Sequence, residues 1–103
     1  MSDSMKIRTK IEGDHIEVKA LIKHPMETGI RKDKNGNVIP AHYIEDLTAE
    51  ANGRVVFSAE WGTGIAANPY ISFRFKGAKA GDELKLSWKD NTGASDSLTV
   101  PIE

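Results

Sequence analysis

Hydrophobic and polar residues alternate along most of this chain. The alternation has a period of two, which is typical of strands that bury one face and expose the other. The clearest run is 15–23, where Ile16, Val18, Ala20 and Ile22 fall on one side. The same pattern predicts further strands in residues 5–11, 43–51, 54–61, 70–76, 83–89 and 97–102. We therefore expect about seven strands and no helix.

Turn-forming residues separate several of these runs. Asn52-Gly53 is a pair that readily supplies the two positive φ angles of a type I′ hairpin. Pro101 has no N–H to donate, so we place it at a sheet edge or a strand end. Many short strands joined by turns predict an all-β, immunoglobulin-like two-sheet sandwich. Its predicted core is Ile16, Val18, Ile22, Leu47, Val55, Phe57, Phe73, Phe75, Leu84, Leu86, Trp88, Leu98 and Val100, with Met5, Ile7 and Ile11 inward on the first strand.

Two segments, 24–42 and 62–70, break the alternation. The first is long for a hairpin connection and the second combines two glycines, a proline and apolar residues. Long loops without periodicity of their own are often functional. We expect any binding function to lie in these two segments.

The composition excludes several classes of function but does not identify one. The chain has 103 residues and a net charge of −1, which indicates one domain and gives no basic excess for nucleic acid or anionic membrane. It contains no cysteine, so disulfides, thiolate metal sites and thiol nucleophiles are excluded. We expect one domain over residues 1–103, with residues 1–4 disordered or foreign to the native chain.

No set of residues has the spacing of a catalytic centre. The serines form no nucleophile elbow, and neighbouring carboxylates on a strand point to opposite faces. His24 and His42 flank the first irregular segment, so a metal or ligand site with Glu27 or Asp46 is one alternative. A small hydrolase that pairs Glu27 or Asp46 with a histidine is a weaker one. A self-associating structural domain is a third, since this fold hosts many functions.

Several motifs together point to one family. The run Leu21–Asp33, which reads LIKHPMETGIRKD, resembles a segment of SoxZ proteins. Residues 35–40 (NGNVIP), 67–70 (ANPY) and 88–90 (WKD) are similar to SoxZ as well, so that the resemblance covers nearly the whole chain from Ile7.

The resemblance implies a non-catalytic subunit without cofactors. SoxZ pairs with SoxY, which carries sulfur intermediates on a cysteine of a mobile arm and presents them to the other Sox enzymes in thiosulfate oxidation. The missing cysteine fits this division of labour. The resemblance also implies a periplasmic location, reached by export with a signal-bearing SoxY. The residues that we predict at the partner interface are His24, Pro25, Met26, Arg31, Trp61, Asn68, Pro69 and Tyr70.

Overall fold

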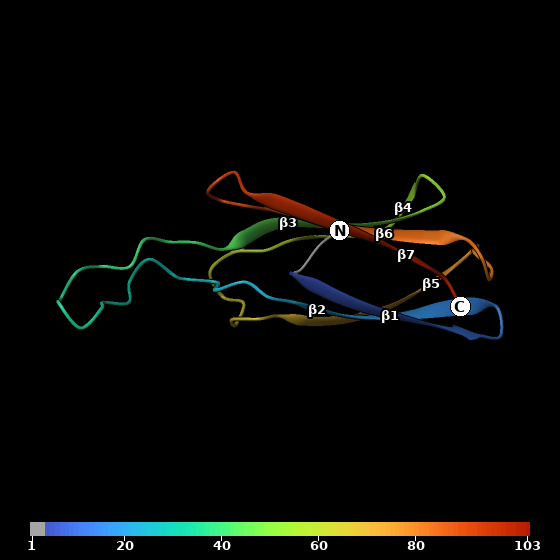
Figure 1. Cartoon of the computed structure of the whole chain (residues 1–103), viewed down its shortest axis with the longest axis horizontal. Helices are drawn as coiled ribbons and strands as arrows, with labels where there is room; N and C mark the ends of the chain where they lie inside the picture. Colours follow the sequence, from blue (N-terminus) through green and yellow to red (C-terminus); the bar gives the residue numbers. More distant parts are fainter. Residues whose placement is uncertain (1–3) are drawn as a thin grey trace.

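Seven antiparallel strands form two facing sheets in the computed structural model, which describes residues 4–103 (Figure 1). The described residues contain no helix, and hence none that could cross a membrane. The strands are β1 (Met5–Glu12), β2 (His15–Ile22), β3 (Ile44–Ala51), β4 (Arg54–Glu60), β5 (Tyr70–Lys76), β6 (Glu83–Asp90) and β7 (Ser95–Pro101). One sheet has the order β1-β2-β5 and the other β4-β3-β6-β7. The predicted all-β two-sheet sandwich is confirmed.

The core lies between the two sheets and is built mainly by the central strands. Every second residue of β2 and β6 is buried, and so is every second residue of β3 from Leu47 onward, as the period of two predicts. Inward residues of the edge strands, such as Phe57 and Phe73, remain partly exposed and stack on each other with ring centroids 4.5 Å apart. Ile44 and Ile102 are fully buried although the sequence pattern did not include them in the core.

Val55 is the clear error in the predicted core. Its side chain is 56% exposed. The pairing of β3 with β4 shifts between Ala49 and Glu50, where Ala49 faces Phe57 and Glu50 faces Val55. Val56 is thus the extra residue of a β-bulge, and a bulge reverses the alternation beyond it. Val55 therefore points outward although it has the same parity as Phe57. Ile11, which we expected to point inward, is also 39% exposed, near the end of edge strand β1.

Hydrogen bonds hold Ser4 and Ile102, near the two ends of the described chain, to the sandwich. The expected disorder of residues 1–3 lies outside the described residues. Ser4 belongs to the sandwich, because its carbonyl accepts a hydrogen bond from the Lys23 N–H and its hydroxyl accepts one from the indole of Trp88. At the other end, Ile102 exchanges backbone hydrogen bonds with the loop between β5 and β6.

Residues 24–42 form an arm that extends beyond the sandwich (Figure 1). Two isolated antiparallel bridges, Glu27 with His42 and Lys32 with Val38, tie its outgoing and returning halves together. The arm makes the molecule elongated, with principal extents of 53 × 21 × 21 Å. We refer to residues 24–42 as the arm. It is an extended ribbon and not an irregular loop.

The two halves of the arm lie very close together near its base. A Cβ built on Gly29 would come 3.0 Å from the Cβ of Ala41, and Gly29 has a φ of 88°. Only glycine combines this conformation with this close approach at no steric cost. Farther out, the Asp33 carboxylate accepts backbone N–H groups of Asn35 and Asn37 and closes the tip.

Candidate functional site

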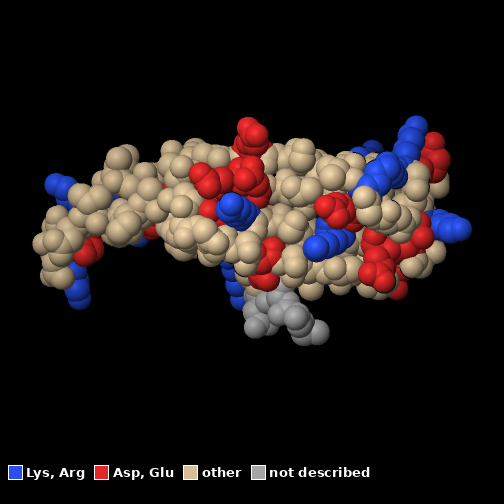
Figure 2. Space-filling model, turned by 90° about the horizontal axis from the view of Figure 1, so that it is seen from above, with Lys and Arg blue, Asp and Glu red and all other residues tan. Residues whose placement is uncertain are grey.

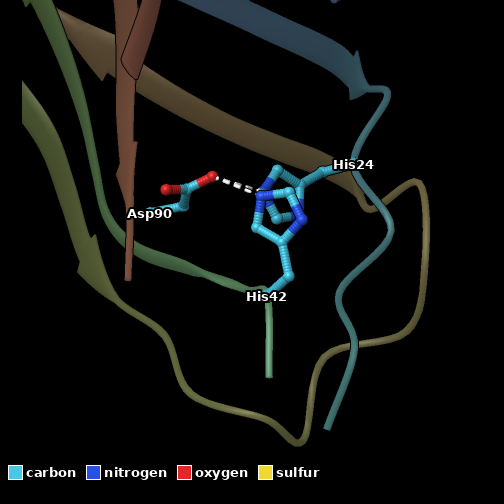
Figure 3. Close-up of side chains that lie close together, drawn as sticks. All are labelled: His24, His42 and Asp90. Atoms are coloured by element: carbon cyan, nitrogen blue, oxygen red, sulfur yellow. Dashed lines mark hydrogen bonds and ion pairs between the residues drawn. The ribbon is translucent and has the colours of Figure 1, made fainter. Parts of the chain in front are cut away.

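Three polar side chains from distant parts of the chain meet at the base of the arm. His24 follows β2, His42 precedes β3, and Asp90 is the last residue of β6 (Figure 3). The two Nε2 atoms lie 3.0 Å (His24) and 2.8 Å (His42) from the same Asp90 oxygen, Oδ2. The side chains of His24 and Asp90 are almost completely buried, whereas that of His42 is 39% exposed. We call these three residues the aspartate clamp, because they join both halves of the arm to the end of β6.

The Asp90 carboxylate is fully occupied as a hydrogen-bond acceptor. Its second oxygen, Oδ1, accepts the backbone N–H groups of Thr92 and Ala94 at 3.0 Å each and the Thr92 hydroxyl at 2.6 Å. Burial favours the neutral acid, but the hydrogen bonds from Thr92, His24 and His42 outweigh it. They hold the pKa of Asp90 well below its ordinary value. Asp90 is therefore a buried carboxylate ion whose negative charge is stabilised by five hydrogen-bond donors.

The backbone determines which His24 nitrogen carries the proton. The Met26 N–H donates to His24 Nδ1 at 3.1 Å, so Nδ1 must offer a lone pair. The proton of the neutral ring is then on Nε2, which donates it to Asp90. The His24 and Trp88 rings lie nearly perpendicular to each other, with centroids 5.2 Å apart, and this packing helps to fix the orientation of the imidazole.

The same geometry bears on a metal-binding function. His24, His42 and Asp90 each offer a ligand atom, all within 4.8 Å of one another. The two histidines therefore do converge, but the carboxylate beside them is Asp90 and neither Glu27 nor Asp46. Glu27 instead holds Arg31 through two hydrogen bonds, of 2.6 and 3.1 Å.

A cation at this position would have to displace the proton from His24 Nε2. The Met26 backbone N–H already donates to Nδ1 of the same ring. To bind the cation through Nε2, His24 would therefore have to become an imidazolate anion or move its proton to Nδ1 and break the hydrogen bond from Met26. Zinc sites also use three or four converging ligands; here there are three within the described residues, and two of them, His24 and His42, already donate hydrogen bonds to the third. The described arrangement is that of a structural hydrogen-bond network.

The predicted interface residues fall into two groups. His24, Met26 and Pro69 are buried, so their side chains support the surface from beneath. Pro25, Arg31, Asn68 and Tyr70 are exposed and Trp61 is half-buried. The backbones of His24 and Asn68 are paired, since the Asn68 N–H donates to the His24 carbonyl and the Asn68 side chain accepts the His24 N–H. The two irregular segments thus form one end of the molecule, and their contact with a partner stays a prediction.

Sequence reasoning missed three residues of this region. Asp90 lies at a strand end directly before the turn sequence Asn-Thr-Gly, a position where an aspartate side chain often accepts backbone N–H groups. That position could have identified Asp90 as a hydrogen-bond acceptor. Ile30 and Val38 are apolar residues within the arm, and they are 83% and 55% exposed. Their place in a segment without alternation could have marked them as unburied.

Comparison with known proteins places the chain in a family. The profile described as "Sulphur oxidation protein SoxZ" matches residues 5–101. The chain belongs to the SoxZ family. Membership supports a role in sulfur oxidation and, at the level of the family, a non-catalytic subunit. A search of curated protein sequences found no match.

Solved structures share the fold. A hypothetical protein from Pyrococcus horikoshii OT3 matches with a TM-score of 0.66 and 22% identity over 97% of this chain and 88% of its own. A superoxide reductase (neelaredoxin) from Archaeoglobus fulgidus, in an E12V variant, matches with a TM-score of 0.67 and 20% identity over 97% and 87%. At such low identity these likenesses show the fold alone.

Proposed function

We propose that this SoxZ chain is the scaffold subunit that binds SoxY, the cysteine-bearing carrier of sulfur intermediates in thiosulfate and sulfur oxidation. The complex then presents those intermediates to the Sox enzymes, with which this chain makes transient contact. We place the pair in the periplasm, reached by export with a signal-bearing SoxY. This chain has no cysteine and so supplies no covalent attachment point.

The exposed apolar face of the arm is the observation that carries this proposal. Among the large hydrophobic residues that the structure describes, Ile30 is the most exposed, at 83%, and Val38 on the returning half is exposed as well. Scattered exposed apolar residues are ordinary on a compact surface, but these two lie on a ribbon that projects beyond the core. Burial of both side chains against a partner would recover hydrophobic free energy that the free chain forgoes.

The arm is braced for such a role. The aspartate clamp holds both of its halves at the base, and the Glu27–Arg31 ion pair spans its outgoing half. The Ile39 N–H donates to the Arg31 carbonyl at 2.8 Å, which joins the halves farther out. A surface that is ordered before binding loses less conformational entropy when the partner docks. The bracing therefore favours a stable complex.

The experiment compares SoxY binding by two matched serine variants. Ile30→Ser removes the most exposed apolar side chain of the arm, and Val55→Ser removes another exposed apolar side chain, on β4. Loss of an isoleucine contact of about 1.5–3 kcal/mol corresponds to a Kd about 10- to 100-fold weaker in calorimetric titration. Val55→Ser should bind as the wild type does. Equal affinity of both variants would overturn the role of the arm.

A further inference from the structure

The outer face of the four-stranded sheet carries charges in an ordered pattern. Strand registers place Asp46 of β3 beside Lys89 of β6, and Glu50 of β3 beside Lys85 of β6. The row between them consists of short hydroxyl side chains, with Thr48 beside Ser87. On these two central strands the acids therefore lie on β3 and the bases on β6, at the two ends of one polar centre, and Glu60 of edge strand β4 lies beside Asp46. Figure 2 looks onto this side of the molecule and shows acidic and basic groups interspersed there.

These four charged groups have no partners within the described part of the chain. None of them takes part in an ion pair there, although arginine, lysine and carboxylate groups elsewhere on the surface do. Asp46, Lys85 and Lys89 are exposed, and Glu50 is half-buried. Their charges are thus available to another molecule.

The arrangement is complementary to itself under one symmetry only. A twofold axis that lies in the face, parallel to the strands and between β3 and β6, sets β3 of one copy over β6 of the other. Asp46 then faces Lys89 of the second copy and Glu50 faces Lys85, and each pair occurs twice. An in-plane axis perpendicular to the strands would instead set acid over acid and base over base. Closed dimers use self-complementary surfaces of the first kind.

The dimensions of the face indicate a weak interface. Four strands spaced about 4.8 Å apart and about seven residues long at about 3.3 Å each cover about 440 Å² in projection. Two copies would bury about 900 Å², which is below the ~1,200 Å² of stable complexes. The short hydroxyl row leaves a shallow hollow of about 520 Å³, lined by Asp46, Lys85 and Lys89 among others. This hollow gives the lysine side chains of both copies room to reach the opposing carboxylates.

We propose that the outer face of the sheet β4-β3-β6-β7 is a self-association surface, on which a second copy of this chain docks about a twofold axis parallel to the strands. Four intermolecular ion pairs, Asp46 with Lys89 and Glu50 with Lys85, determine its register. The surface is separate from the arm, so a SoxYZ pair could dimerise through this chain.

Charge reversal tests this pairing directly. Sedimentation equilibrium of the wild type up to about 2 mM should give a dimer with a Kd of about 0.1–1 mM that weakens as salt is raised. The acidic-face variant Lys85→Glu/Lys89→Glu and the basic-face variant Asp46→Lys/Glu50→Lys should each remain monomeric. An equimolar mixture of the two variants should associate at least as tightly as the wild type, because all four facing pairs are again opposite in charge.

Two results would overturn the proposal. One is a wild-type chain that is monomeric over the whole concentration range, and the other is an association that both charge variants retain. The Ile30→Ser variant should dimerise like the wild type, and both face variants should bind SoxY unchanged. Loss of SoxY binding by the face variants would show that SoxY occupies this face, and would count against a second copy.

Discussion

Replacing Asp90 by asparagine removes the acceptor on which the aspartate clamp depends. The side chain keeps its size, but Oδ2 becomes an NH2 group, which can only donate. That group would face Nε2–H of His24 and Nε2–H of His42, both of which are donors in the present arrangement. Rotating the amide by 180° does not help, because its NH2 would then face three donors from Thr92 and Ala94.

The cost follows from the burial of each donor. His24 is buried and cannot change its tautomer while Met26 donates to Nδ1, so its N–H loses a charge-assisted hydrogen bond worth about 1.5–3 kcal/mol. His42 is 39% exposed and can turn its N–H to water, which limits its loss to about 1 kcal/mol. The variant should therefore be less stable by about 2.5–4 kcal/mol.

Urea unfolding followed by tryptophan fluorescence measures this difference. With an m-value of about 1.3 kcal/mol/M, the midpoint should fall by about 2–3 M with little change in m. Asp46→Asn is the matched control, since Asp46 is exposed and should change stability by less than about 0.5 kcal/mol. A loss below about 1 kcal/mol for Asp90→Asn would refute the Nε2–H tautomer of His24 and the five hydrogen-bond donors to Asp90.

The remaining predictions concern pH, metal ions and two sites on the sandwich. The pKa of Asp90 is lower in the folded protein than in the unfolded chain, so its contribution to stability should be complete above about pH 4 and lost as the pH falls further. Between about pH 4 and 2, the urea midpoint of Asp90→Asn should therefore decline less than that of the wild type. Added zinc should leave the thermal midpoint unchanged, since His24 Nε2 is protonated; a rise with zinc concentration would restore the metal hypothesis. Val55→Thr should change the free energy of unfolding by less than about 0.5 kcal/mol, whereas a value typical of a core site would contradict the bulge. Gly77→Ala should cost about 1–3 kcal/mol by chemical denaturation, because Gly77 has a φ of 95°, which alanine adopts only with backbone strain; a neutral effect would contradict the strain.

The sandwich could be predicted from sequence because its strands obey one local rule. Alternation placed Ile16, Val18, Leu84 and Leu86 correctly, since each strand must bury one face. The rule failed at Val55 because the bulge depends on how β3 pairs with β4. The residue pattern within one strand gives no information about that pairing.

The site was predictable only in part. The sequence placed His24 and His42 at the two ends of one segment, and the structure brings their rings together, with centroids 4.6 Å apart. It could not supply Asp90, which lies 48 residues beyond His42 and reaches the clamp through the pairing of β3 with β6. Nor could it show that the arm is a ribbon, because its bridges join halves that have no alternation of their own.

Binding of SoxY by the arm is the central claim, and one titration tests it most directly. Purified SoxY is titrated into the wild-type chain and into Ile30→Ser/Val38→Ser, with Val55→Ser as the control for loss of an exposed apolar side chain. We expect a 1:1 complex with the wild type and the control, and an affinity at least about 100-fold lower for the arm variant at unchanged urea midpoint. An arm variant that binds SoxY as tightly as the wild type would contradict the account.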